Sequence, residues 1–299
     1  MDNVCQFCAE KGDTRITVHT VFTGIDLAYH SVHTDGCCLR TEAQGNFIEI
    51  HHCREGRMEQ CQKKGFFYLM PGDLSVSRRK QRSVRYRFPL CYYQGISIII
   101  DTDIAPECFS CFLEDVNVRP KELAERLCKK EDCFVIRSQD YAEHIFSELY
   151  AVPKSCQKGY FKVKILELLL VLSGMDARKN RLTSGILSKS QADLAKKASA
   201  YLSAHIDGQI TVSELSEKFH VSQTCLQNAF KGMYGVPVCS YMRILKMQSA
   251  ALRLIHTDDT VLEIASDYGY DNASKFACAF RKVMGDLPAE YRKLHGRTG

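Results

Sequence analysis

Polar side chains in one short segment are suited to reading DNA bases. Gln and Asn hydrogen-bond N6 and N7 of adenine together, each good bidentate pair giving ~1–3 kcal/mol of discrimination, and a Thr methyl contacts thymine. In a helix, these side chains would lie opposite the apolar Leu226 and Phe230. We therefore predict that this segment, with the positive charge of Lys231 beside it, contacts DNA bases through Gln223, Thr224, Gln227 and Asn228.

A second segment, fifty residues later, carries a less selective set. Its predicted outward positions are Asn272, Ala273, Ser274, Lys275 and Cys278. Cys278 is a poor hydrogen-bond donor, whereas Lys275 and the Ser274 hydroxyl suit phosphate oxygens. We predict that the first segment reads sequence and that the second mainly holds the backbone. Replacing Gln227 or Asn228 by Ala should therefore relax base preference, and Lys275→Ala should weaken binding evenly.

Both segments lie in a unit that the chain repeats. Residues between 211 and 219 recur 49 positions later, and residues between 226 and 235 recur 50 positions later. Such repetition indicates one supersecondary unit used twice. The first copy has Thr211, Val212, Glu214, Leu215, Ser216, Phe219, Leu226, Phe230, Lys231 and Gly235 where the second has Thr260, Val261, Glu263, Ile264, Ala265, Tyr268, Phe276, Phe280, Arg281 and Gly285.

Each copy predicts a helix, a tight turn and a second helix. In the first copy, Thr211 and Glu214 form a capping-box pattern, Ser222 caps the second helix and Gly235 ends it. Pro237 is predicted at the first position of a longer helix that runs to about His256. The corresponding roles in the second copy fall to Thr260, Gly269, Asp271 or Asn272, Gly285 and Pro288.

Two short helices joined by a tight turn are the geometry of the helix-turn-helix, whose second helix enters the major groove. The predicted recognition helices are 223–233 and 273–283. A helix over 238–255 would be ~27 Å long, near the ~34 Å between successive major grooves on one face of B-DNA. An ordinary helical bundle is the alternative, because any three-helix unit buries Leu and Phe at these spacings.

The segment 192–294 resembles the DNA-binding domain of the AraC/XylS family of bacterial transcription regulators. This resemblance implies a sequence-specific regulator that binds double-stranded DNA, works with RNA polymerase, and carries a cupin-like sensor domain at its N-terminus. The residues that carry it are Leu215, Phe219, Val221, Ser222, Leu226, Phe230, Lys231, Gly235, Tyr241, Lys246, Ala250, Leu254, Ile264, Ala265, Gly269, Tyr270, Phe276, Phe280, Arg281, Lys282, Gly285, Pro288, Tyr291 and Arg292.

Length and composition favour two folded domains. The 299 residues are 45% hydrophobic and 25% charged, with a net charge of +5. No apolar run is long enough to span a bilayer, and residues 1–11 lack the order of a signal peptide, so we expect a cytoplasmic protein without a membrane partner. We predict an α+β chain with an N-terminal domain over 1–185, a linker over 178–189 and a DNA-binding domain over 190–299.

The N-terminal domain is predicted to be β-rich over about 14–116 and helical over about 119–176. Short β-branched and aromatic runs separated by Gly, Asp, Asn and Pro are typical of a small barrel or a double-sheet jelly roll. The spacing of Gly45, His51, Gly65 and 71–73 resembles the cupin pattern. Metal cupins hold their ion with a His-x-His pair, whereas His51 is followed by His52 and Cys53, so we expect a pocket without a metal or other cofactor.

Fifteen cysteines raise the question of metal or redox chemistry. Their odd number and irregular spacing favour free, mostly buried thiols over a disulfide framework. Two Cys-x-x-Cys pairs, at 5–8 and 108–111, are too far apart for a compact zinc ribbon. The chain also lacks the nucleophile and phosphate-loop motifs of common enzymes. We therefore predict a regulator and not an enzyme; the alternative is a DNA-repair or cupin-type metalloenzyme carrying an AraC-like module.

Two further features concern ligands and partners. The stretch 74–100 contains no acidic residue and carries six basic ones, at 78, 79, 80, 82, 85 and 87. It is either a solvated hairpin or a site for DNA backbone or an anionic effector. The segment 160–172 is apolar over more of its circumference than one packed face needs, so it is either central in its domain or the surface of a homodimer. The identity of the small-molecule effector is not predicted.

Overall fold

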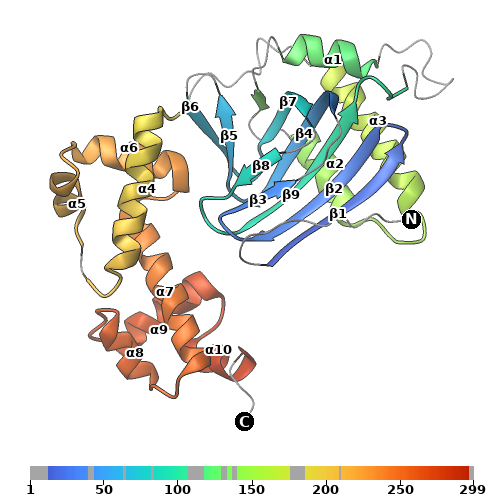
Figure 1. Cartoon of the computed structure of the whole chain (residues 1–299). Helices are drawn as coiled ribbons and strands as arrows, with labels where there is room; N and C mark the ends of the chain where they lie inside the picture. Colours follow the sequence, from blue (N-terminus) through green and yellow to red (C-terminus); the bar gives the residue numbers. More distant parts are fainter. Residues whose placement is uncertain are drawn as a thin grey trace. The chain divides into compact units, whose positions relative to one another are not determined.

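The computed structural model describes residues 13–39, 44–62, 65–81, 84–106, 118–128, 133–136, 140–175, 186–208 and 210–295. The chain forms two compact units, 1–186 and 187–299 (Figure 1). The first is β-rich with helices and the second is all-helical, as the α+β prediction requires. The second unit begins at Leu187, three residues before the predicted boundary; most of the predicted linker, 178–185, lies outside the described residues.

The described part of the first unit is built on an antiparallel six-stranded sheet with two short ladders. The short β-branched and aromatic runs around 47–50, 66–69, 84–88 and 96–100 lie in strands, as the prediction of a β-rich domain requires. The sheet has the order β1 (Asp13–Phe22), β2 (Ile25–His33), β9 (Tyr93–Asp101), β4 (Gln44–Gly56), β7 (Leu74–Gln81) and β10 (Phe134–Ile136), and the ladders pair β3 (Gly36–Leu39) with β8 (Val84–Arg87) and β5 (Met58–Gln62) with β6 (Gly65–Leu69).

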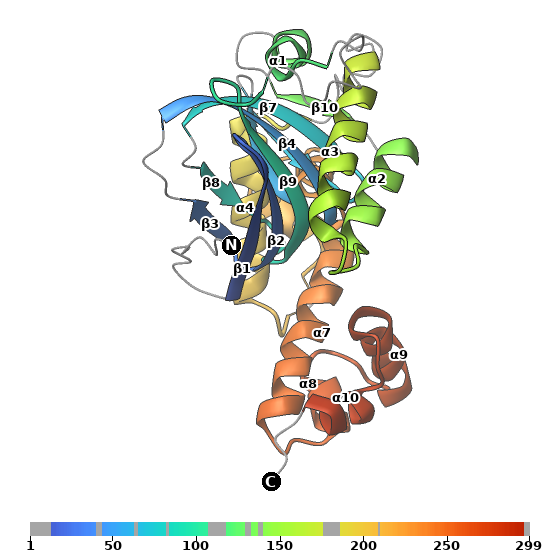
Figure 2. The same cartoon turned by 90° about the vertical axis from the view of Figure 1, so that its right-hand side faces the viewer.

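Alternation along β4 divides the interior into two layers. Ile48 and Ile50 point to the core beneath the helices, whereas Cys53 lies in the core on the other face, with the aromatic residues of β8 and β9. Figure 2 shows α2 and α3 on one face of the sheet and β3 and β8 on the other. The polar side chains of Glu49 and His51 point to the same face of β4 as Cys53, and both are buried. The second layer therefore has a polar interior.

The helices described in this unit are α1 (Pro120–Leu127), α2 (Asp140–Tyr150) and α3 (Gln157–Gly174). The predicted helical segment, about 119–176, also contains the short strand β10, where Phe134 pairs with Val76 of β7. On α3, Phe161 and Ile165 are buried in the core, whereas Val163 is 61% exposed. The helix thus packs one face on the sheet and leaves an apolar residue outside.

A buried histidine lies under α2. The ring of His52 stacks on Phe146 with centroids 4.2 Å apart. Burial, with the charges of His51 and Arg54, lowers the pKa of His52 to about 4. The folded chain therefore holds this imidazole neutral.

No disulfide joins the described cysteines, and contrary to the prediction these thiols are not mostly buried. Those with buried side chains are Cys37, Cys53, Cys128 and Cys133, and those with exposed ones are Cys61, Cys91, Cys156, Cys239 and Cys278. Within the described part of the chain, no group of three or more His, Cys, Asp or Glu side chains is placed to hold a metal ion. The Cys-x-x-Cys pairs at 5–8 and 108–111 lie outside that part. No described helix is long and apolar enough to cross a membrane.

Seven helices are described in the second unit. A capping box of Ser188 and Gln191 starts the first of them, and Leu187 packs against α6 beside Gly232. In chain order the helices are α4 (Lys189–Ala204), α5 (Val212–Lys218), α6 (Gln223–Tyr234), α7 (Val238–His256), α8 (Val261–Asp267), α9 (Ala273–Met284) and α10 (Pro288–His295).

Candidate nucleic-acid interface

The first predicted motif is formed by α5 and α6. Thr211 Oγ1 accepts from Glu214 N–H at 3.2 Å, and Glu214 Oε2 accepts from Thr211 N–H at 2.8 Å, which confirms the capping box. Ser222 caps α6, and Gly235 ends it in the left-handed conformation. Pro237 is the N-cap of α7 and not its first helical residue, because its ψ of 156° is extended. The helix, turn, helix order is as predicted.

The second motif, formed by α8 and α9, repeats this geometry. Thr260 and Glu263 make the same reciprocal capping bonds, at 3.2 Å and 2.7 Å. Of the two predicted caps, Asn272 is the one used: its Oδ1 accepts from the backbone N–H groups of Ser274 and Lys275. In the turn, Gly269 has a φ of 79°, and His220 adopts the equivalent conformation in the first copy with a φ of 53°.

The two motifs are joined by α7, which belongs to both cores. Its 19 residues give a length of about 28 Å. Tyr241 contacts Phe230 of the first motif, and its hydroxyl bonds Ser199 at 2.8 Å. Lys246 Nζ donates to the Tyr268 carbonyl at 3.0 Å, at the end of α8. Helix α7 therefore contacts each motif through specific side-chain interactions.

Most of the predicted base-reading and phosphate-binding residues are exposed. On α6 these are Gln223, Thr224, Asn228 and Lys231, and around the start of α9 and along it they are Asn272, Ser274, Lys275 and Cys278; Ala273 is half-buried. Gln223 Nε2 also donates to Ser213 Oγ at 3.3 Å, which links the two helices of the first motif. Asn272 is occupied as a cap, so its amide oxygen is turned toward its own helix.

Gln227 is not an outward residue. Its side chain is half-buried, and its Oε1 accepts from Val238 N–H, the first residue of α7, at 3.4 Å. The prediction failed because the buried stripe of α6 is wider than Leu226 and Phe230 alone: Ala229 and Met233 are also fully buried. This stripe and the start of α7 place Gln227 at the edge of the core. Its counterpart in the second motif is Ala277.

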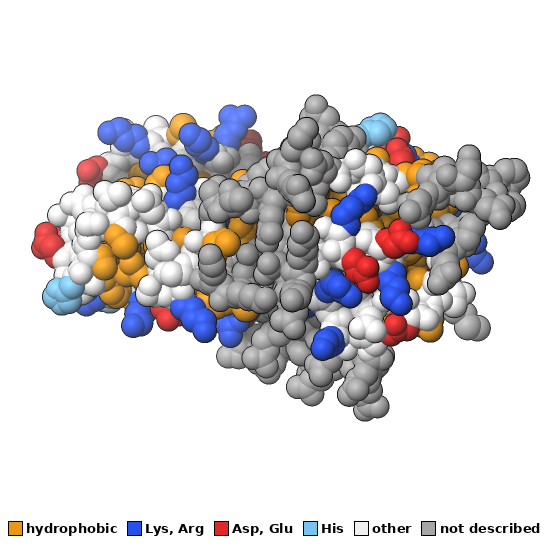
Figure 3. Space-filling view, turned by 90° about the horizontal axis from the view of Figure 1, so that it is seen from above, with side chains coloured by type: hydrophobic (Ala, Val, Ile, Leu, Met, Phe, Trp, Pro, Cys, Tyr) orange, Lys and Arg blue, Asp and Glu red, His pale blue; other side chains and the backbone are white. Residues whose placement is uncertain are grey.

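Positive charge in the second unit is local. The stretch 191–299 has thirteen Lys and Arg against eleven Asp and Glu, a net of +2. The basic side chains on the recognition helices, Lys231, Lys275, Arg281 and Lys282, are all exposed. On the face shown in Figure 3, which includes parts of both units, Lys and Arg are interspersed with Asp and Glu. Contact with phosphates must therefore come from side chains at particular positions and not from a uniformly basic domain.

The first unit contains a separate polar site inside its β-structure. Glu49 Oε1 accepts from the Tyr86 hydroxyl at 2.5 Å, and Glu49 Oε2 pairs with an Arg79 NH2 group at 2.6 Å. His51 Nε2 lies 2.6 Å from the Tyr93 hydroxyl. Burial opposes ionisation of Glu49, but Arg79 and His51 outweigh it and hold the pKa of this carboxyl well below its usual range. The site is a buried, charged network.

A histidine extends the network. His30 Nε2 lies 2.7 Å from Ser97 Oγ, and its ring centroid is 5.1 Å from that of His51. Burial and the neighbouring His51 lower the pKa of His30 to about 3. Among the described residues, buried atoms of this region without a hydrogen-bond partner are His30 Nδ1, His51 Nδ1, Ser75 Oγ and Arg79 Nε. Single-sequence reasoning missed these groups because strands far apart in the chain bring them together.

Known proteins resemble the second unit most clearly. The family model described as a helix-turn-helix domain matches residues 215–294. The right origin-binding protein of Escherichia coli (strain K12) is 29% identical over 103 residues, covering 34% of this chain and 36% of that protein. An uncharacterized HTH-type transcriptional regulator of Staphylococcus aureus (strain MSSA476) is 27% identical over 250 residues, covering 82% of this chain and 30% of that protein. The chain thus spans about a third of the length of these relatives.

Solved structures similar to this chain include the C-terminal domain of AraT, a response regulator from Geobacillus stearothermophilus. It is 28% identical, with a TM-score of 0.34, and the match covers 35% of this chain and 88% of that one. The DNA-binding domain of AdpA, solved in complex with a target DNA, is 22% identical with a TM-score of 0.32 and covers 33% of this chain and 90% of that one. The family model thus places a helix-turn-helix domain over residues 215–294, and the predicted resemblance of the second unit to the AraC/XylS regulators is confirmed.

Proposed function

We propose that this chain is a sequence-specific DNA-binding transcription regulator that places α6 and α9 in successive major grooves. The observation that carries the proposal is the pair of capped motifs joined by the 19-residue α7, which is about 28 Å long. A single helix-turn-helix motif would also fit an ordinary helical bundle, whereas two motifs joined by α7 fit two successive turns of the DNA major groove. The regulators among the relatives support the same conclusion.

The two motifs have different roles in DNA recognition. Thr224 and Asn228, exposed on α6, reach base edges, and Gln223 joins them from the first turn. Gln227 is removed from this set because it bonds the start of α7. On α9, Lys275 and the Ser274 hydroxyl contact phosphates, and Cys278 adds no strong donor. Asn272 and Ala273 hold the helix start, and Lys231 contributes phosphate contacts to the first motif.

The first unit regulates this activity. Its polar interior binds a small-molecule effector, and the exposed Val163 on α3, beside half-buried Leu166 and Leu170, forms part of a homodimer surface. A DNA-bound regulator of this kind contacts RNA polymerase and acts in the cytoplasm, and no enzymatic step is assigned to it. An enzyme that carries a DNA-binding module remains the alternative, and bound zinc in the purified protein would favour it.

The proposal is tested by selecting binding sites for the full chain from a random DNA pool. We expect one enriched motif, relaxed at one or two positions by Asn228→Ala. The matched control is Lys197→Ala, which removes an exposed charge from α4 of the same unit. Absence of any enriched sequence, or an altered motif with Lys197→Ala and not with Asn228→Ala, would show that α6 does not read the bases.

A further inference from the structure

Two adjacent residues anchor the chain where one unit ends and the other begins. Ile186, the last residue of the first unit, packs against the core of the second layer of that unit. Leu187, the first residue of the second unit, is 6% exposed and packs against α6. Consecutive Cα atoms are only 3.8 Å apart across a trans peptide bond. A displacement of the backbone at Ile186 must therefore move Leu187.

Leu187 lies directly against Gly232 of the recognition helix α6. A Cβ atom built on Gly232 would lie 2.8 Å from Leu187 Cδ2 and 3.2 Å from Leu187 Cγ, so this approach requires glycine. Glycine inside a helix is less stable than alanine, which makes the contact costly to keep. The equivalent position of the second motif, fifty residues later, is the exposed Lys282. The close approach is therefore specific to α6.

A capping box holds the backbone of Leu187 in place. The Ser188 hydroxyl accepts from Gln191 N–H at 3.2 Å, and Ser188 N–H donates to Gln191 Oε1 at 2.9 Å. Leu187 thus occupies the N′ position of α4, where an apolar side chain sets the angle at which the chain enters the helix. The N4 residue that would face such a side chain is the small, fully buried Ala192. Its size leaves room for Leu187 to reach α6.

The contact lies beside the surface that is proposed to read bases. Gly232 follows the exposed Asn228 by four residues on α6. Residues four apart lie on the same side of a helix, one turn from each other. Leu187 therefore packs on α6 one turn beyond Asn228, and a shift of Leu187 would change how that side of the helix is held.

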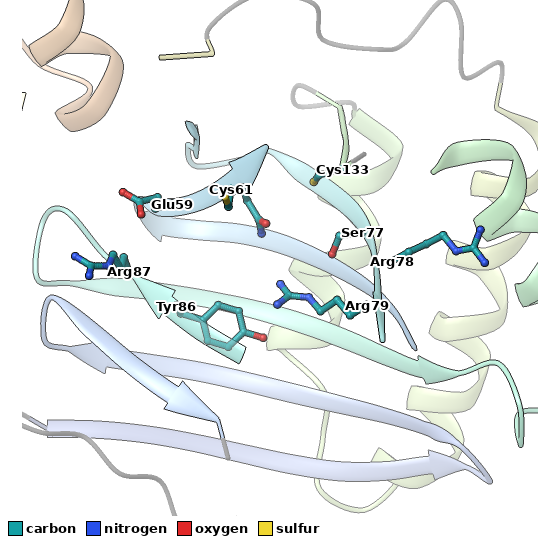
Figure 4. Close-up of a pocket in the computed structure, with 9 residues that line it drawn as sticks. Glu59, Cys61, Ser77, Arg78, Arg79, Tyr86, Arg87 and Cys133 are labelled. Carbon is teal, nitrogen blue, oxygen red and sulfur yellow. The ribbon is translucent and has the colours of Figure 1, made fainter. Parts of the chain in front are cut away.

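The core that holds Ile186 also borders the polar interior of the first unit. Tyr86 and Cys133 belong to this core, and both line a cavity of about 260 Å³ between β5, β7 and β8 (Figure 4). Three arginines of the basic stretch 74–100 line the same cavity. Tyr86 also donates to the buried carboxylate network. A change in the polar interior would thus be felt by the core against which Ile186 packs.

We propose that Leu187 is a positioning residue through which the first unit controls α6. The inference rests on the proposed regulatory function and assigns the contact that carries the signal. A change in the polar interior shifts the core under Ile186, the shift passes to Leu187 through one peptide bond, and Leu187 repositions α6 through Gly232. The second motif is not affected in this way, because α9 has Lys282 at the equivalent position.

The test is a double-mutant cycle in the full chain, with two readouts: affinity for a selected DNA site, and hydrogen–deuterium exchange of the amides of α6 and α9. Leu187→Ala should weaken DNA affinity by roughly twofold to thirtyfold, and Ile186→Ala by roughly twofold to tenfold. Both should speed exchange in α6 and not in α9. Ile186→Ala should cause no further loss once Leu187 is replaced, because its effect passes through that side chain.

Three results of this cycle would overturn the proposal. The first is a double variant whose loss of affinity is the product of the two single losses, since the residues would then act independently. The second is equal acceleration of exchange in α6 and α9, which would show general loosening of the second unit. The third is unchanged affinity and exchange in Leu187→Ala.

The contact itself is tested by size. Gly232→Ala should mimic Leu187→Ala although alanine favours a helix, because the new Cβ displaces the leucine. In the Leu187→Ala background the same change should cause no further loss, since the space is then free. Leu187→Met, which keeps the volume and the reach, should bind DNA like the wild type. Wild-type behaviour of Gly232→Ala would show that the contact does not position α6.

Val18→Ala is the matched control. Val18 on β1 is a partly buried residue that packs against the same core as Ile186. Its replacement should leave exchange in α6 unchanged. If Val18→Ala speeds that exchange as much as Ile186→Ala does, the first unit acts through its general stability and the route through Leu187 is wrong. Failure of the wild-type chain to bind any DNA would refute the proposed function, whereas intact DNA binding with unresponsive α6 amides would remove this inference alone.

Discussion

Gln227 should stabilise the start of α7 and not read a base. Pro237, the N-cap of α7, makes no side-chain capping bond, and Gln227 Oε1 accepts from the N–H of Val238 in its place. Gln227→Ala removes that acceptor and leaves a half-buried N–H without it. The change should therefore lower the stability of the second unit while leaving base preference intact.

The magnitude follows from the geometry. Loss of an N-terminal cap costs about 0.5–2 kcal/mol, and a net hydrogen bond contributes about 0.5–1.5 kcal/mol. At 3.4 Å the bond is long, so we expect the lower part of these ranges, about 0.5–1 kcal/mol. For a small domain, this corresponds to a fall in Tm of roughly 2–8 °C.

The assay is thermal and urea unfolding of the full chain, followed by circular dichroism at 222 nm, together with site selection. Gln227→Glu is the matched variant, because its carboxylate keeps the acceptor and favours a helix N-terminus. It should retain the stability that Gln227→Ala loses. Asn228→Ala, exposed one residue later, should not destabilise the unit but should relax base preference.

Two results would refute this reasoning. The first is a Gln227→Ala variant of unchanged Tm whose selected motif has lost a position, which would return Gln227 to the base-reading set. The second is a Gln227→Glu variant as unstable as Gln227→Ala. In that case the amide would contribute through packing and not through its acceptor oxygen.

Three further predictions concern caps, phosphates and pH. Thr211→Ala and Thr260→Ala should each cost about 1 kcal/mol in urea unfolding, and wild-type stability of both would contradict the capping role. Lys275→Ala should lower the slope of log affinity against log salt by about one without altering the selected motif; a changed motif would make Lys275 a base reader. The pKa of His52 is about 4 in the folded chain and about 6.5 in the unfolded chain, so the stability that its neutral form contributes is complete above pH 6.5 and falls by about 2 kcal/mol at pH 5. The variant His52→Phe should therefore flatten the pH dependence of Tm. An unchanged slope of Tm against pH would contradict this assignment.

Local signals in the sequence predicted most of the second unit. Caps such as Thr211 and Thr260 act within three residues, and Gly235 and Gly285 end their helices through their own backbone conformations. Such features depend on short-range chemistry that the residue types reveal. The outward placement of Gln227 failed because it depends on where the next helix begins, which no local pattern of α6 records.

The contacts in the polar interior of the first unit could not be predicted from the sequence, for a similar reason. Glu49 and Arg79 meet because β4 pairs with β7, and Tyr86 reaches Glu49 from β8 across the layer. In the sequence, Arg79 is one basic residue of a polar run, and nothing marks it as different from its neighbour Arg78. Alternation in a strand tells which residues share a face but not which strand lies opposite.

The central claim, that both motifs bind one DNA site together, is tested most directly by hydroxyl-radical footprinting of the full chain on its selected sequence. Because α7, which is about 28 Å long, joins the motif of α6 to the motif of α9, we predict two protected segments about one helical turn, ~10 bp, apart on the same face of the duplex. Lys275→Ala should weaken protection in the segment under α9 first. A single protected segment, or two on opposite faces of the duplex, would contradict the account.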